Sequence, residues 1–216
     1  MTELIKKVDV SEGKRGLWRI ERFTVDERGA QVHNMIAVRD ARMTGAVPRS
    51  IVPGRYTRLW HDDEVIMSDT PAEMREHLPI VRAARGQVLI NGLGLGLVVA
   101  ACLEKPEVEH VTVVELAPEV IELVGPHYQA RYGSRLTIVQ ADALTWELPE
   151  GAHYAAVWHD IWPDVSPDNL LPMRQLREKY RGRTDWQGCW CYSYCVRMAE
   201  FERRRADRHS SIVKRA

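Results

Sequence analysis

Residues 88–97, VLINGLGLGL, constrain the fold of this chain more than any other segment. The apolar run that ends at Asn91 predicts a buried strand, and the glycines that follow predict a tight loop. The apolar run at 97–105 predicts a helix directly after that loop. A strand, a glycine loop and a helix in this order let a ligand approach the backbone closely, because glycine has no side chain.

The spacing of the glycines narrows the choice of ligand. Dinucleotide-binding loops have the pattern G-x-G-x-x-G, and their last glycine lets the helix pack on the strand. Here the pattern is G-x-G-x-G, and that last glycine would stand at Leu97. The loop therefore disfavours a nicotinamide dinucleotide, and a tight turn without a ligand is the structural alternative. The residues expected to contact a cofactor are Asn91, Gly92, Leu93, Gly94 and Gly96.

Short apolar strands alternate with helices after residue 87. This alternation predicts a Rossmann-like, doubly wound α/β domain with a mainly parallel sheet, which we place at 70–183. Thr70 is expected to cap its first helix, with Glu73 completing a capping box. Gly125 and Pro126 are expected to bend or end a later helix. The strands are expected at 88–91, 110–115, 135–140 and 154–160, and the helices at 70–84, 97–105, 118–132 and 167–180.

The first 69 residues predict a small antiparallel β unit. They contain segments rich in β-forming residues that are separated by short turns, as in hairpins. One hairpin is expected from 15–25 and 30–38, and another from 56–60 and 64–68.

Residues 184–216 form a third section, an aromatic segment followed by a basic tail. The spacing of its aromatic residues favours a helix over 184–205, although their density also suits a strand. Cys189, Cys191 and Cys195 have a spacing that no common zinc site shares, so no metal is expected. The last 15 residues carry six basic and two acidic side chains. They predict a solvated tail or, alternatively, an anion-binding arm.

Basic and acidic residues balance at 30 each, so no net charge attracts nucleic acid or a membrane surface. No apolar run approaches the roughly 20 residues that span a bilayer, and the N-terminus lacks the apolar core of a secretory signal. We therefore expect a cytoplasmic protein whose partner is a small molecule. The short sheet also favours a homodimer, unless the aromatic segment itself covers the sheet edge.

Two carboxylates follow the next strands of the expected sheet, where ligands of such folds bind. Glu115 ends the strand VTVVE and can accept hydrogen bonds from both hydroxyls of a ribose, with Leu116 beside it. Asp142 can accept the amino group of adenine, and Ala143 can offer its backbone N–H to the ring. The structural alternatives are a helix N-terminal charge for Glu115 and a helix cap for Asp142.

The segment WHDIWPD closes the fourth strand, where group-transfer enzymes of this type place their reactive residues. Asp160 is the candidate to orient or deprotonate a nucleophile, and His159 is the other candidate base. Trp162 can stack on a planar substrate or on a cation. Asp164 is a further candidate for contact with the substrate.

These elements together resemble the spermidine synthase branch of the class I S-adenosylmethionine (SAM)-dependent transferases. The resemblance rests on the β unit, the glycine loop, VVELAPEVIELV, ADA and the aspartate after the fourth strand, and covers roughly residues 54–164. It implies SAM as the cofactor and a shortened version of the seven-stranded class I core. HDDEVIMSDTPAEMREHLP resembles the segment that leads into the loop of that branch. By that resemblance, Asp69 faces the acceptor or the methionine amine.

Two departures from that branch affect the expected reaction. Polyamine synthases carry acids where this chain has Leu95 and Pro163, and those acids hold cationic amines. The leading hypothesis is therefore a SAM-dependent methyltransferase that acts on a small-molecule acceptor. The alternatives are a spermidine synthase-like aminopropyltransferase and a SAM-binding protein without transfer activity. A DNA amino-methyltransferase is disfavoured, because the D/N-P-P-Y/F tetrapeptide is absent at Asp160.

Overall fold

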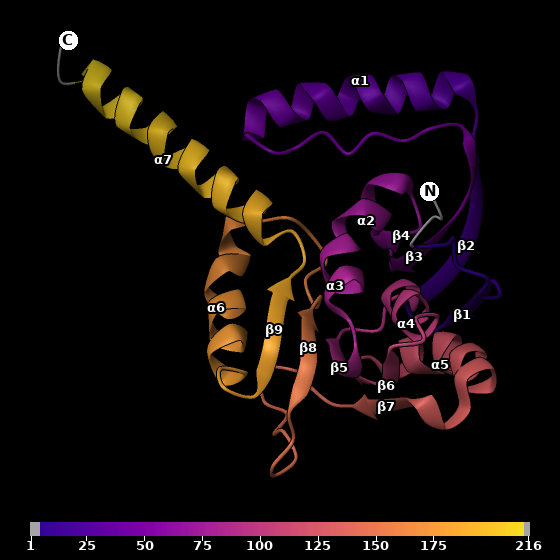
Figure 1. The fold of residues 1–216 in the computed structure, drawn as a ribbon. Helices are drawn as coiled ribbons and strands as arrows, with labels where there is room; N and C mark the ends of the chain where they lie inside the picture. The colour runs from indigo at the N-terminus through magenta and orange to yellow at the C-terminus, as the bar shows by residue number, and fades with distance from the viewer. Residues whose placement is uncertain (1–4, 214–216) are drawn as a thin grey trace.

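The chain folds into two β-sheets, each with its own helices, as a computed structural model shows (Figure 1). The structure describes residues 5–213, with side chains placed up to residue 207. Part of the predicted basic tail, including Arg208, Lys214 and Arg215, therefore lies outside the described side chains. Within the described helices, none is both long and apolar enough to cross a membrane.

The larger sheet is parallel throughout and has the strand order β7-β6-β5-β8-β9. This order reverses direction beside β5, as in doubly wound folds. Helices α3 (Leu78–Ala83), α4 and α5 pack on one face and α6 on the other. The predicted Rossmann-like α/β fold is thus confirmed, with five strands. The strands are β5 (Gly86–Asn91), β6 (Val108–Glu115), β7 (Leu136–Gln140), β8 (Tyr154–His159) and β9 (Thr184–Cys189); the helices are α4 (Leu97–Leu103), α5 (Pro118–Tyr132) and α6 (Leu170–Lys179).

The smaller sheet is antiparallel and comes from the N-terminal part of the chain. The hairpin predicted from 56–60 and 64–68 is confirmed, with Asp62 in a left-handed turn conformation. The hairpin predicted from 15–25 and 30–38 is wrong, because the second of these segments is helical. The strands of the smaller sheet are β1 (Gly13–Arg15), β2 (Trp18–Val25), β3 (Gly54–His61) and β4 (Glu64–Ser68).

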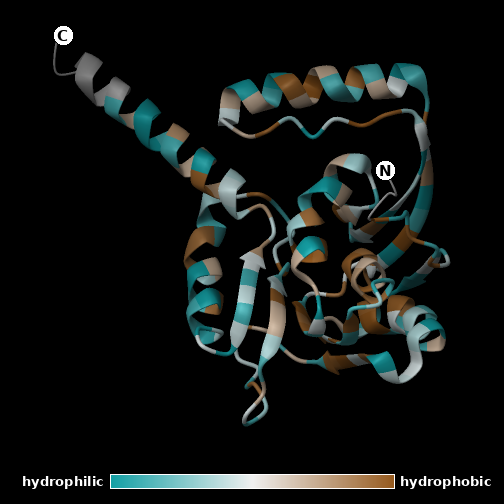
Figure 2. Ribbon diagram, viewed as in Figure 1, coloured by the Kyte–Doolittle hydropathy of each residue, from teal (hydrophilic) through white to brown (hydrophobic). Residues whose placement is uncertain are grey.

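Helix α1 (Glu27–Thr44) takes the place of the expected second strand. Asp26 caps it, since its Oδ1 accepts a hydrogen bond from the Gly29 N–H at 2.6 Å, and Gly45 ends it in the left-handed conformation. Only Ala30 of this helix is fully buried, against Ile51 and Tyr56. The rest of the helix is largely exposed, and apolar and polar residues alternate along it (Figure 2).

The helix predicted at 70–84 is present but divided into α2 (Pro71–Glu76) and α3 (Leu78–Ala83). Pro79 explains the break, because its ring clashes with the carbonyl four residues earlier in a continuous helix. The predicted capping box is wrong. The Thr70 side chain makes no cap hydrogen bond, and the Glu73 carboxylate instead accepts from the N–H and hydroxyl of Ser68, both at 2.9 Å.

Two further expectations are corrected in the C-terminal half. Helix α5 continues through Pro126, whose ring lies at an exposed position while Val124 and Tyr128 anchor the helix in the core. The helix expected over 184–205 begins only at α7 (Tyr192–Val213), since β9 pairs with β8 and its Trp186 stacks on Trp158. The aromatic segment itself therefore forms the fifth strand of the sheet.

The capping role of Asp26 leads to a prediction about α1. Asp26→Ala is expected to lower the free energy of unfolding by about 1 kcal/mol, because it leaves helix N–H groups unpaired. Urea unfolding followed by circular dichroism measures the change. Asp26→Asn keeps a side-chain oxygen at the same place and should stay close to the parent protein. Equal losses in both variants would contradict the capping role.

Candidate functional site

A cavity of about 560 Å³ opens between the two sheets, beyond the carboxyl ends of β5, β6, β7 and β8. This is the place where ligands of doubly wound folds bind, and the volume is that of a small-molecule site. Five of its lining side chains are acidic, and none of those described is Lys or Arg. The acidic residues are Glu64, Glu73, Glu115, Asp142 and Asp160.

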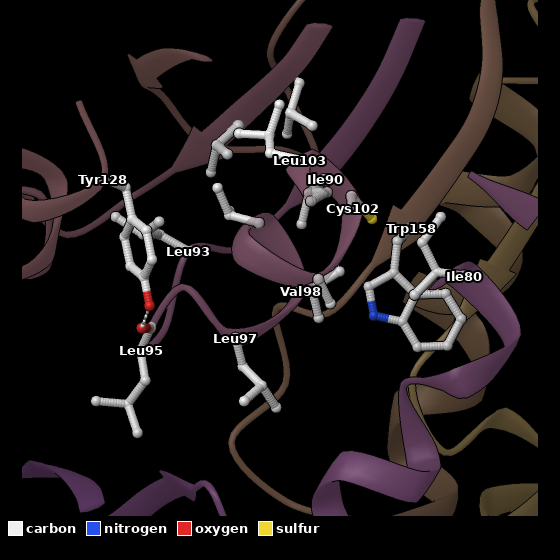
Figure 3. Packing of buried hydrophobic residues seen from close by; sticks show 14 of the residues in the cluster. Ile80, Ile90, Leu93, Leu95, Leu97, Val98, Cys102, Leu103, Tyr128 and Trp158 are labelled. Carbon is white, nitrogen blue, oxygen red and sulfur yellow. Dashed lines mark hydrogen bonds between the residues drawn. The ribbon is translucent and has the colours of Figure 1, made fainter. Parts of the chain in front are cut away.

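The glycine loop forms one wall of this cavity and tolerates no side chains. All three glycines have positive φ angles, of 101°, 51° and 74°. A Cβ at Gly92 would overlap the Asp160 carbonyl oxygen, and one at Gly94 would overlap the Met67 sulfur. A Cβ at Gly96 would overlap the ring of Tyr128, whose hydroxyl donates to the Leu95 carbonyl at 2.9 Å (Figure 3). Gly92 and Gly94 line the cavity, whereas Gly96 serves the packing of the loop.

Glu115 stands at the end of β6 and ties the loop to the next helix. Its Oε2 accepts from the Leu93 N–H at 2.7 Å and its Oε1 from the Ala117 N–H at 2.9 Å. Both oxygens have a second lone pair for a ligand in the cavity. Leu116 beside it also lines the cavity and is 67% exposed. The Leu93 side chain is buried in the core, so only its backbone belongs to the site.

Asp142 and Ala143 line the cavity beyond β7. Asp142 Oδ1 accepts from the Leu144 N–H at 2.8 Å, which fixes the carboxylate at the start of a turn. The Ala143 carbonyl accepts from the Lys179 ammonium at 3.0 Å. The structure thus brings Glu115 and Asp142 to one cavity, as predicted, although Asp142 also has the structural role that was its alternative.

Alternation along the strands separates two predicted residues from the site. Asn91 and His159 lie opposite each other in β5 and β8, and the Asn91 amide contacts His159 Nδ1 at 2.8 Å. Both side chains are fully buried on the face covered by α6, beside Tyr180. Burial also lowers the pKa of His159 to about 4. His159 as a base and the Asn91 side chain as a cofactor contact are therefore not supported, whereas Asp160 does line the cavity.

Asp160 lies among buried charges at the floor of the cavity. Its side chain is 20% exposed, and its Oδ2 lies 3.9 Å from Nδ1 of His77. Burial, and then repulsion from Glu73 and Glu76, raise the pKa of Asp160 well above its ordinary value. The raised pKa favours the protonated carboxyl group, which can donate a hydrogen bond toward the cavity.

Glu73 belongs to the same cluster and was expected only to cap a helix. It lines the cavity, and burial raises its pKa to about 7 despite the attraction of Arg49. Arg49 Nη2 lies 3.4 Å from Glu73 and 3.0 Å from Glu76. One guanidinium thus faces three carboxyl groups, and His77, with a pKa lowered to about 3 by burial, adds no charge.

The remaining predicted residues divide between the cavity and other places. Trp162 lines the cavity. Asp69 does not, because its carboxylate is buried and accepts from the Thr57 N–H at 2.6 Å and the Val8 N–H at 3.2 Å. Asp164 is exposed outside the cavity, near Asn169. The β unit and the loop before α7 supply a further wall of the cavity that no sequence pattern indicated. It includes Trp18, Leu59, His61, Glu64, Ile66 and Trp190.

The four cysteines are free thiols and buried. Burial raises the pKa of Cys189 to about 12 and raises that of Cys191 further, so these thiols stay protonated. Within the described part of the chain, no three His, Cys, Asp or Glu side chains are arranged to hold a metal ion.

Comparison with known proteins gives one partial match in sequence. No family model matches the chain. The chain is 38% identical over 78 residues to polyamine aminopropyltransferases 1 and 2 of Ralstonia nicotianae. That match covers 32% of this chain and only 15% of each relative. The predicted resemblance to the spermidine synthase branch is therefore confirmed over part of the chain.

Solved methyltransferase structures match about half of the chain. The CcbJ methyltransferase of Streptomyces caelestis is 25% identical with a TM-score of 0.38, over 48% of this chain and 43% of that chain. The glycopeptide N-methyltransferase MtfA, complexed with SAM, is 21% identical with a TM-score of 0.39, over 51% of this chain and 45% of that chain. The fold assignment rests on the strand order of the larger sheet.

The packing of the glycine loop can be tested at Gly96. Gly96→Ala is expected to lower the free energy of unfolding by about 3 kcal/mol or more, because it combines a strained φ with overlap on Tyr128. Gly182→Ala is the matched control, since Gly182 has a positive φ of 73°, close to the 74° of Gly96, but nothing within 4 Å of an added Cβ. It should lose only about 1 kcal/mol. Urea unfolding curves give both values, and equal losses would contradict the packing role.

The raised pKa of Glu73 predicts how stability depends on pH. Its value in the folded protein is about 7 against 4.5 for the ordinary group, so its stabilising effect is complete below about pH 4.5 and is lost as pH rises through 7. Glu73→Gln is expected to make this fall shallower, by up to about 1.4 kcal/mol per pH unit. Unfolding free energies between pH 5 and 8 measure it.

The matched control for Glu73 is Glu64→Gln, at an exposed position of the same cavity. An equal change of slope in both variants would mean that Glu73 is not the group responsible.

Proposed function

We propose that this chain is a SAM-dependent methyltransferase that acts on a small-molecule acceptor. The observation that carries the proposal is the convergence of the glycine loop, Glu115 and Asp142 on one acidic cavity at the carboxyl ends of the parallel strands. Each of the three offers the contact that a different part of an adenosyl ligand needs. The five carboxyl side chains of the lining also favour a ligand with a positive charge.

The described residues fit SAM in shape and in chemistry. The backbone at Gly92 and Gly94 can approach the ligand closely, since both residues line the cavity and have no side chain. The Glu115 carboxylate suits the two ribose hydroxyls, and Asp142 with Ala143 suits the edge of adenine. The partial similarity to aminopropyltransferases, which covers 32% of this chain, agrees with an adenosyl cofactor.

When bound, SAM supplies a methyl group on a cationic sulfur, and the C–S bond breaks as a lone pair of the acceptor bonds to the methyl carbon. The protein contributes position and electrostatics to such a transfer. Asp160, which lines the cavity, hydrogen-bonds to the acceptor and orients it. Trp162 and Trp18 exclude water from the cavity. Glu73, whose pKa is about 7, can take up the proton that the acceptor releases.

Aminopropyl transfer is the second candidate, because the sequence match is to aminopropyltransferases. The observation against it is Leu95, which is buried and leaves the glycine loop without an acid for the cofactor amine. Turnover assays with decarboxylated SAM and putrescine, run beside SAM and candidate methyl acceptors, distinguish the two reactions.

The proposed cofactor site predicts a loss of SAM affinity on changing Glu115. Glu115→Gln removes the charge and weakens the acceptance of ribose hydrogen bonds, so we expect SAM binding at least about tenfold weaker. Isothermal titration calorimetry measures this. Glu109→Gln is the matched control, because Glu109 lies on the same strand at an exposed position.

Binding of SAM to the parent protein is the first requirement of that experiment. Absence of heat at millimolar SAM would reject the proposed function. Equal affinity in the parent protein and the Glu115 variant would reject the assigned ribose contact.

A further inference from the structure

A second cavity of about 580 Å³ lies beside the first one and has no part in the proposed cofactor site. It lies on the opposite face of the small sheet, between that sheet and the start of α1, where it contacts Phe23, Arg58 and His33. The two cavities share lining residues at and beside the edge strand β4, so a molecule in either cavity contacts this common wall. The shared residues are Ile66, Met67, Glu73 and Pro163.

The two cavities differ in charge. The first has five carboxyl side chains and, among its described lining residues, no Lys or Arg. The second has two guanidinium groups, those of Arg49 and Arg58. Of its two carboxylates, Asp26 caps α1 and Glu73 belongs to the shared wall. The first cavity therefore suits a cation. In the second cavity Arg49 is already paired with Glu73 and Glu76, so the group that can receive an anion there is Arg58.

Arg58 is held in place for recognition of an anion. Its guanidinium carbon lies 4.7 Å from the ring centre of Phe23 and 4.5 Å from that of Trp60. Glu21 binds its Nε and Nη2, at 3.2 Å and 3.1 Å, and leaves the N–H groups of Nη1 for a ligand. A guanidinium fixed between aromatic rings loses little freedom when it binds a carboxylate.

Apolar side chains complete the second cavity. Phe23, Val25, Ile51 and Val65 contribute to its walls. A ligand that fills it therefore needs an apolar body as well as an anionic group. Such an amphipathic ligand differs from the cationic amines that the partially similar aminopropyltransferases are named for.

We propose that the second cavity binds the acceptor, and that this acceptor is a carboxylate with an apolar body whose carboxylate pairs with Arg58 and whose nucleophilic atom reaches Glu73 and Met67 at the shared wall. The identification of this ligand as the methyl acceptor rests on the proposed methyl transfer. Its structural part, an anion-selective apolar cavity, stands apart from the identity of the cofactor.

The Met67 side chain lies where the two cavities meet and contacts the glycine loop. Its sulfur accepts a hydrogen bond from the Leu95 N–H at 3.0 Å and fills the space beside Gly94. A thioether is a weak acceptor that rotates easily, so a ligand can displace it. Met67 is therefore the part of the shared wall that can move most easily.

The test uses three probes with the same apolar body: 3-phenylpropionate, its amide and 3-phenylpropylamine. Each is titrated into the full chain in the presence of S-adenosylhomocysteine, and the dissociation constant is measured by calorimetry. We expect the carboxylate to bind at least tenfold more tightly than the amine. Arg58→Gln should remove this preference, while Arg55→Gln, an exposed position on the same strand, should change it less than twofold.

A second variant tests the cavity independently, in case the Arg58 variant misfolds. Val65→Phe narrows the second cavity at a position that is 41% exposed and does not line the first one. It should weaken binding of 3-phenylpropionate at least fivefold and leave S-adenosylhomocysteine binding unchanged. Absence of carboxylate binding, equal or tighter binding of the amine, or no effect of either variant overturns the inference. If the parent protein does not bind SAM, that result counts against the proposed function alone.

Discussion

The joint between β5 and α4 is the constraint on which the rest of the structure depends. Each of its three glycines has a positive φ and a neighbour that excludes a Cβ. At Gly92 that neighbour is the backbone of Asp160, directly after β8, at Gly94 it is Met67 of β4 in the small sheet, and at Gly96 it is Tyr128 of α5. One loop therefore fixes the positions of both sheets and a helix, and the cavity between them follows from that packing.

Beside this joint, buried carboxyl groups outnumber the positively charged groups around them, and this imbalance affects the chemistry of the cavity. Glu73, Glu76 and Asp160 are gathered around one guanidinium, Arg49, and the neutral His77 does not relieve their repulsion. A buried carboxylate without a full partner is costly, so the pKa values of all three carboxyl groups are raised. A ligand with a positive charge changes this balance, because it favours ionised carboxyl groups.

The sequence predicted the Rossmann-like core well because that part obeys local rules. The order of strands and helices, the loop and the acids Glu115 and Asp142 all follow from periodicity and from strand ends. The prediction of His159 as a base failed for a physical reason that was already present in the sequence. Side chains alternate along a strand, so the residue beside Asp160 had to face the opposite side of the sheet. The failure over 30–38 had no such remedy, because its β-forming residues are mostly exposed on the helix and therefore leave no pattern of burial in the sequence.

What no local pattern revealed is the contact between the two sheets. Trp18, His61 and Ile66 line the cavity only because β2, β3 and β4 are held against the glycine loop by Met67. Their positions depend on contacts between segments far apart in the chain, which periodicity does not encode. The same contact sets the edge strand β4 between an acidic cavity and one that contains two guanidinium groups. In the proposed transfer, the carboxyl side chains around the donor and the Arg58 guanidinium beside the acceptor make each cavity disfavour the ligand of the other.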